Sequence, residues 1–114
     1  MFVGKVVGQV WASKKVPTLE GFKLLLVEPL RRAEAASPQE GPREDLVVAA
    51  DASVGAGVGE YVVVSYGRAA RICLGRGQDI AAEAAIAGVV DELEIEKGLA
   101  TEPRLPGFTK EARR

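Results

Sequence analysis

The chain of 114 residues contains no histidine and only one cysteine, Cys73. The missing histidine excludes nucleophile systems that need an imidazole base, and it excludes zinc sites built on histidine ligands. A single thiol cannot form a disulfide within the chain. Cys73 stands between Ile72 and Leu74, and no histidine is present to activate its thiol, so we expect a small buried core residue there.

An excess of charge of one sign is also lacking. Fifteen Lys and Arg residues stand against sixteen Asp and Glu residues, which gives a formal net charge of −1. This balance leaves no basic surplus to neutralise a phosphate backbone. The aromatic residues are only one Trp, two Tyr and three Phe, and they are scattered along the chain, so they predict no stacking platform for bases. A nucleic-acid partner is therefore not expected.

Long hydrophobic runs are absent as well. The run from Leu24 to Val27 is bounded by Lys23 and Glu28, whereas a membrane helix needs about 20 apolar residues. The first residues place Lys5 after an apolar start and are followed by no continuous apolar run, which is not the pattern of a signal peptide. We expect a soluble protein of the cytoplasm with no membrane partner.

The composition that remains is that of a single globular domain. Apolar residues make up 47% and charged residues 27% of the chain, so a hydrophobic core is expected and wholesale disorder is not. Alternating and β-branched residues predict several short strands. The expected strands are 2–12, 22–29, 46–51, 61–66, a shorter one at 69–74, and 86–96.

Helices have little room between these strands. Asp79 is a plausible N-cap for a short helix from Ile80 to about Ala85, and the segment 31–45 is predicted to be an exposed connection with at most one helical turn. No predicted helix is long enough for a βαβ crossover, so the sequence indicates an all-β barrel. The pattern dissolves after residue 96, which divides the chain into a barrel domain, 1–96, and an extension or tail, 97–114.

Glycine occurs at regular intervals in two places. Gly4 and Gly8 share one face of the first strand, a spacing that indicates strong coiling or close backbone approach. Gly55, Gly57 and Gly59 form a glycine-rich segment that differs from the G-x-G-x-x-G spacing and precedes a strand instead of a helix. A nucleotide-binding loop is therefore not favoured. We expect a tight corner, or a place where another backbone packs closely within or between subunits.

Other polar groups have a structural and a functional interpretation. Glu92, Glu94 and Glu96 alternate with apolar residues, which favours a solvated strand face over paired catalytic acids or a metal site. Trp11 before Lys14 and Lys15 is expected to be a packed tryptophan beside two solvated lysines. Two arginines that flank a pair of alanines are either surface residues or contacts across an interface, and both interpretations stay open: Arg68 and Arg71.

Several segments together resemble the pentameric vertex proteins of bacterial microcompartments, the family of the carboxysome and ethanolamine-utilisation vertex subunits. The most specific piece is Gly-Ala-Gly-Val-Gly-Glu at residues 55–60. Order and approximate spacing agree along residues 2–95. The matching segments are 4–15, 19–27, 48–64, 67–71 and 86–91. The chain departs from the family at Arg68-Ala69, where a small polar pair is usual.

The resemblance implies a small closed five-stranded β-barrel of the oligonucleotide-binding type, used for assembly. It implies a homopentamer that caps the fivefold vertices of an icosahedral shell built otherwise of hexameric shell proteins, with no catalysis. No cofactor and no metal are expected. It also implies subunit-interface or pore positions, which are carried over to Val54, Gly55, Ala56, Gly57, Gly59, Glu60, Arg68 and Arg71. The alternatives are a nucleic-acid- or ligand-binding barrel of the same type and a small enzyme using Asp91, Glu92 and Glu94.

Overall fold

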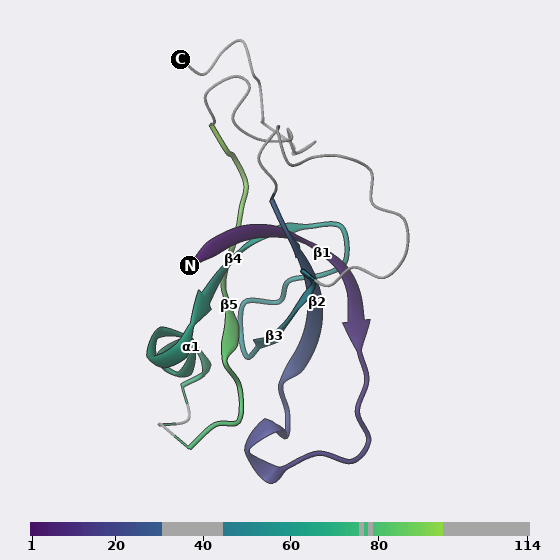
Figure 1. Cartoon of the computed structure of the whole chain (residues 1–114), viewed down its shortest axis with the longest axis vertical. Coiled ribbons are helices and arrows are strands. Elements are labelled where there is room, and N and C mark those ends of the chain that lie inside the picture. The colour runs from purple at the N-terminus through teal and green to yellow at the C-terminus, as the bar shows by residue number, and fades with distance from the viewer. Residues whose placement is uncertain (31–44, 76, 78, 95–114) are drawn as a thin grey trace.

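The computed structural model of the chain describes residues 1–30, 45–75, 77 and 79–94, and these form a small barrel with one helix across its wall (Figure 1). Five strands close the barrel in the order β1-β2-β3-β5-β4. All neighbouring strands are antiparallel except β3 and β5, which are parallel and pair at Ala50 and Ala85. The strands are β1 (Phe2–Val10), β2 (Lys23–Pro29), β3 (Val47–Asp51), β4 (Tyr61–Tyr66) and β5 (Ala84–Val89).

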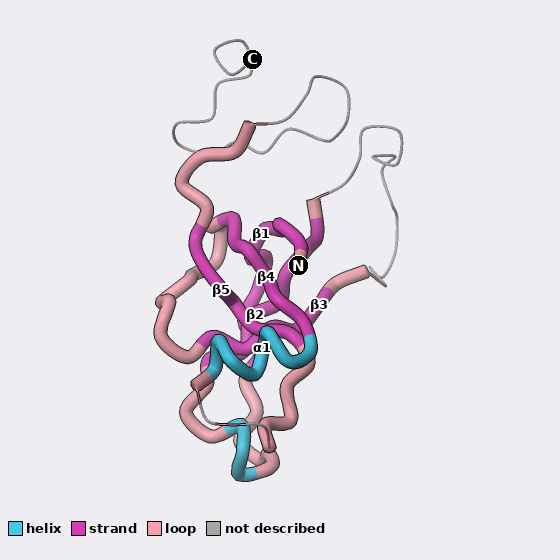
Figure 2. The backbone as a smooth tube through the Cα atoms, turned by 90° about the vertical axis from the view of Figure 1, so that its left-hand side faces the viewer, coloured by secondary structure: helices cyan, strands magenta, loops and turns pink. Residues whose placement is uncertain are grey.

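Two short helical segments accompany the strands. A 3-10 turn, η1 (Pro17–Leu19), lies in the long connection between β1 and β2, and α1 (Gly67–Leu74) follows β4 directly. Figure 2 shows α1 lying across the strands near one end of the barrel. Within the described residues no helix is long and apolar enough to cross a membrane.

The core has two parts, one inside the barrel and one outside its wall. Strands β3 and β5 contribute residues to both parts, so they are buried on both faces. Inward-facing residues fill the barrel, among them Leu25, Val62 and Val64, all with no exposed surface. A second cluster lies between α1 and the outside of the wall, where Ala70 and Leu74 of α1 pack against Ala85 of β5. Successive residues of β5 therefore belong to different clusters, so both faces of this strand must be apolar.

Glycine allows β1 and β2 to approach closely. A Cβ atom added at Gly4 would lie 2.6 Å from the Glu28 carbonyl oxygen and 2.7 Å from a Val27 methyl carbon, so only glycine fits without displacement. The predicted close approach is confirmed at this position. At Gly8 the nearest neighbour of such an atom, in Leu26, is at an ordinary 3.6 Å. The register of the pair shifts between Val6 and Gly8, which marks a bulge.

The barrel and its first four strands confirm the sequence predictions, with ends that differ by a few residues. The strand predicted at 69–74 is wrong, because this segment is helical and belongs to α1. Gly67, with φ of 57°, is the first residue of α1, and Gly75, with φ of 72°, caps the helix in the left-handed conformation. Ala70 and Leu74, four residues apart, form the buried stripe of the helix.

The predicted helix from Ile80 to about Ala85 is also wrong. Residues 79–83 form no helix, and β5 begins at Ala84. The last strand, predicted at 86–96, therefore starts two residues earlier and ends at Val89, while residues 90–94 lie outside any strand. The connection predicted at 31–45 lies outside the described residues except for Asp45, and so does the extension predicted at 97–114. The division at residue 96 stays a prediction.

Candidate functional site

Residues 52–60, which we call the glycine loop, join β3 to β4. The loop follows Asp51, the last residue of β3, which is only 4% exposed. Its Oδ1 accepts hydrogen bonds from the backbone N–H groups of Val54 at 2.9 Å and Gly55 at 3.4 Å, and its Oδ2 accepts from Ala56 at 2.7 Å. Aspartate favours such turns because its short carboxylate reaches the backbone a few residues on. One buried carboxylate thus fixes the first half of the loop.

Neighbouring strands hold the rest of the loop. The ammonium group of Lys23 on β2 donates to the carbonyl oxygen of Ala56. On β1, the carbonyl oxygen of Val6 accepts from Gly59 at 2.8 Å, and the N–H of Val6 donates to Glu60 at 2.9 Å. The side chain of Ala56 has no exposed surface and belongs to the barrel core. The loop is therefore anchored at both ends and in the middle.

The tip of the loop is a tight turn over residues 57–60. The N–H of Glu60 donates to the Gly57 carbonyl oxygen at 3.2 Å, and the Glu60 carboxylate accepts from the Gly57 N–H at 2.8 Å. Gly59, the third residue of this turn, has φ of 95°, a positive value as in a type II turn. The turn leaves Val58 at its tip with 62% of its surface exposed, next to the exposed Glu60. Val54, earlier in the loop, is 38% exposed.

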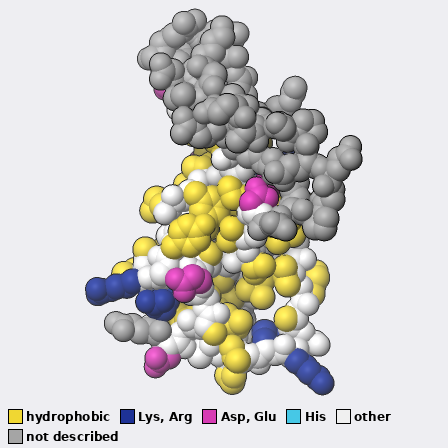
Figure 3. All heavy atoms as spheres, in the orientation of Figure 1, with side chains coloured by type: hydrophobic (Ala, Val, Ile, Leu, Met, Phe, Trp, Pro, Cys, Tyr) yellow, Lys and Arg dark blue, Asp and Glu magenta, His cyan; other side chains and the backbone are white. Residues whose placement is uncertain are grey.

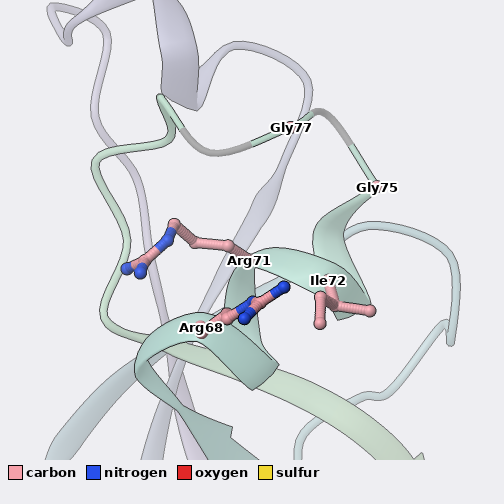
Figure 4. A pocket seen from close by; sticks show the side chains of 5 residues that line it. All are labelled: Arg68, Arg71, Ile72, Gly75 and Gly77. Carbon is pink, nitrogen blue, oxygen red and sulfur yellow. The ribbon is translucent and has the colours of Figure 1, made fainter.

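A second group of predicted site residues lies on α1. Arg68, Arg71 and Ile72 line a hollow of about 350 Å³ together with Gly75 and Gly77 (Figure 4). Arg68 is exposed, Arg71 is half-buried and Ile72 is 69% exposed. In Figure 4 the two guanidinium groups point to opposite sides. Within the described residues neither arginine takes part in an ion pair, so this face carries two positive charges beside an apolar side chain.

The turn at 57–60 and α1 do not meet within one subunit. The glycine loop leads into the start of β4, whereas α1 follows the end of the same strand. A strand of six residues separates them by roughly 17 Å at about 3.3 Å per residue. In Figure 1 α1 lies at the lower left, and the loop reaches β1 on the right before β4 begins. Figure 3 shows basic side chains projecting at the lower left, on the side of α1.

Two side chains expected to be buried are exposed. Cys73 is an exposed free thiol on α1, and its Sγ lies 3.4 Å from the Oγ of Ser65. The helical course of 67–74 turns it away from the buried stripe of Ala70 and Leu74. Trp11 is 83% exposed, because it follows the end of β1 and no longer belongs to the barrel wall. Of the two lysines beside it, Lys15 donates to the Ala12 carbonyl oxygen at 2.7 Å.

The acidic residues near the end of β5 do not share a strand face in the described part of the chain. Asp91, Glu92 and Glu94 are exposed and lie beyond the strand, so the single strand face that was predicted does not exist there, and Glu96 lies outside the described residues. No cluster of three or more potential metal ligands occurs in the described ranges.

The sequence predictions missed Asp51 and Lys23 as residues that organise the loop. The available indication was an acidic residue at a strand end before a Ser- and Gly-rich segment, a pattern typical of side-chain-capped turns. Which amides the carboxylate reaches depends on the path of the loop, which the sequence alone does not specify.

The sequence of this chain is similar to those of known proteins. The family model described as "Ethanolamine utilisation protein EutN/carboxysome" matches residues 1–91. The carboxysome shell vertex protein CcmL of Nostoc sp. (strain PCC 7120) is 39% identical, over 87% of this chain and 91% of that protein. The microcompartment shell vertex protein PduN of Salmonella typhimurium is 44% identical, over 82% of this chain and 98% of that protein.

A solved structure extends the similarity to three dimensions. The GrpN pentameric microcompartment shell protein from Rhodospirillum rubrum has a TM-score of 0.65 and 36% sequence identity to this chain. The similarity covers 84% of this chain and all of the GrpN chain. The barrel described above is therefore also the fold of the GrpN chain.

Proposed function

The chain belongs to the EutN/carboxysome vertex protein family, and from this premise we propose that it forms a homopentamer that caps the fivefold vertices of a bacterial microcompartment shell. The observation that carries the proposal is the similarity, over more than four fifths of the chain, to proteins named as shell vertex proteins, one of them solved under the description of a pentamer. Its place is then the shell of a microcompartment in the cytoplasm.

The candidate site supports an assembly role. The glycine loop is held in one shape by Asp51, Lys23 and β1, yet it presents Val54 and Val58 to solvent. An ordered loop with exposed apolar side chains is suited to contact another protein, because little conformational freedom is lost on binding. We propose the loop and the arginine-bearing face of α1 as subunit-interface or pore surfaces.

The proposed role needs no chemistry from this chain. Shell tiles of sixfold symmetry cover flat facets, and a pentamer supplies the curvature at which facets meet. Hexameric shell proteins are thus the expected partners, and the chain is proposed to be structural and not an enzyme. The alternative of a nucleic-acid-binding barrel is not favoured by the relatives, because the matches given above are named as shell vertex proteins or as a pentameric shell protein.

Co-expression with hexameric shell proteins tests the vertex role. We expect closed polyhedral particles when the full chain is present, and open or elongated assemblies when it is omitted, as seen by electron microscopy. The chain should co-purify with the particles as a minor component. Particles that close equally well without the chain, and exclude it when it is present, would show that it does not cap vertices of that shell.

A further inference from the structure

The glycine loop and the α1 face have complementary surfaces that one subunit cannot bring together. We infer that the loop of one copy docks on the α1 face of the next copy, so that the carboxylate of Glu60 pairs with the guanidinium of Arg71 and Val58 packs on Ile72. This inference rests on the proposed function, because it names the partner surface of the same assembly.

Charge supports this pairing. Glu60 is exposed, and its bond to the Gly57 N–H occupies only part of the acceptor capacity of the carboxylate while fixing its position. Arg71 is half-buried and has no ion-pair partner among the described residues. A half-buried arginine side chain loses less freedom on pairing than a fully exposed one. Arg71 is therefore the main donor to the Glu60 carboxylate, and the exposed Arg68 contributes less.

Shape and apolar surface support it as well. Val58 sits at the convex tip of a tight turn, with 62% of its surface exposed. Ile72, 69% exposed, lines a hollow of about 350 Å³ on α1 that has room for a valine side chain and a carboxylate. Each subunit thus carries one projecting and one hollow surface, each combining an aliphatic group with a charge, and the two charges are opposite.

The arrangement on β4 explains why the partner is another copy. The loop enters β4 and α1 leaves it, so the two surfaces lie at opposite ends of a strand about 17 Å long. Two different, complementary patches on one chain produce a head-to-tail contact, and such contacts close into a ring when the rotation between copies fits. A fivefold ring requires contacts of this kind, because a ring of odd number cannot be built from twofold-symmetric contacts alone.

Thiol cross-linking tests the contact directly. Cys73 is first replaced by serine, since it is exposed beside Ile72. Val58→Cys and Ile72→Cys are then combined in one chain and treated with a short thiol-reactive cross-linker. We expect a covalent ladder from dimer to pentamer. Val58→Cys combined with Val16→Cys is the matched control, because Val16 is 51% exposed but lies on the β1–β2 connection, and it should give no ladder.

Charge reversal tests the ion pair. Glu60→Arg and Arg71→Glu should each raise the chain concentration at which half of the rings dissociate by about tenfold or more, the range measured for close charge pairs at interfaces. The two changes combined in one chain recreate an opposite pair at every contact, so the ring should recover most of its stability. Glu60→Gln keeps an acceptor for the Gly57 N–H and should weaken the ring by about threefold.

The outcomes separate this inference from the proposed function. Suppose that the unaltered chain forms pentamers, but the Val58/Ile72 cysteine pair gives no ladder and the double charge reversal does not recover the ring. The loop and α1 then do not meet and the inference is wrong, while the vertex role stands. If the unaltered chain forms no ring, the proposed function itself fails. Circular dichroism of each variant, compared with the unaltered chain, establishes that the barrel remains folded.

Discussion

The barrel wall and the glycine loop both depend on glycine, but for different physical reasons. In the wall, Gly4 is needed because an added Cβ would meet the backbone of β2 at 2.6 Å. In the loop, Gly55 and Gly59 are needed because their φ angles of 80° and 95° suit no other residue well. Gly57 has neither property, since φ is not positive there and a Cβ would meet only Glu60 Oε1, at 3.7 Å.

This difference separates residues that make the fold from residues available for assembly. Where a close backbone approach or a positive φ within the subunit already requires glycine, the glycine gives no information about partners. Neither requirement applies to Gly57. If this position needs glycine, the cause is therefore a contact with another subunit. The following four variants are ordered by their expected effect on the stability of the barrel. This is measured by urea denaturation at a chain concentration low enough to dissociate the ring, because ring formation adds to apparent stability.

The largest effect is expected for Asp51→Ala. Three backbone N–H groups lose their carboxylate acceptor, and that of Ala56 is buried. The free energy of unfolding should fall by roughly 3 kcal/mol, since hydrogen bonds to charged groups are worth about 1.5–3 kcal/mol. Asp51→Asn retains one oxygen acceptor and should lose about half as much. A loss below about 1 kcal/mol for the alanine variant would mean that Asp51 does not hold the loop.

Gly4→Ala should lower the free energy of unfolding by about 2 kcal/mol, because the new methyl group collides with the Glu28 carbonyl and with Val27. Gly8→Ala is the matched control on the same strand. Its methyl group would find ordinary contacts near 3.6 Å, so we expect a change within about 0.5 kcal/mol. Equal effects at the two positions would contradict the close approach of β1 and β2.

Gly59→Ala should cost about 1 kcal/mol, the lower end of the range for a non-glycine residue held at an unfavourable positive φ. No steric collision adds to this figure, because nothing lies within 4 Å of an added Cβ. Asparagine tolerates the left-handed region better than alanine does, so Gly59→Asn should cost less. An asparagine variant less stable than the alanine variant would argue against backbone strain as the cause.

The smallest effect on the barrel is expected for Gly57→Val, within about 0.5 kcal/mol. Its effect on the ring should be large, because a bulky β-branched side chain beside Val58 would obstruct the docking of the loop. Analytical ultracentrifugation of the folded variant should show a shift from rings toward single subunits. Pentamers as stable as those of the unaltered chain would remove the loop from the interface.

Much of the fold follows from the sequence, and the part that does not has a specific cause. Strands β1, β2, β3 and β4 carry β-branched or aliphatic runs bounded by glycine, proline or acidic residues. The region from 67 to 86 was misassigned because β5 is buried on both faces and so lacks alternation, while the small residues at 81–85 favour a helix locally. The tertiary contact with α1 overrides that preference.

For α1, two glycines eight residues apart and the spacing of Ala70 and Leu74 were present in the sequence. The apolar run Ile72–Leu74 outweighed them and suggested a strand. For the candidate site, too, some features could be predicted from the sequence and others could not. The glycine and arginine positions were predicted from the resemblance and stay predictions. The three bonds of Asp51, the burial of Ala56 and the separation of the 57–60 turn from α1 depend on the chain path.

Assembly into a ring of five is the central claim, and native mass spectrometry of the full chain at low concentration tests it most directly. The subunit mass is 12.0 kDa, so the account predicts a dominant species at five times that value, about 60 kDa. A single species at 12.0 kDa, unchanged as the concentration is raised, would contradict it.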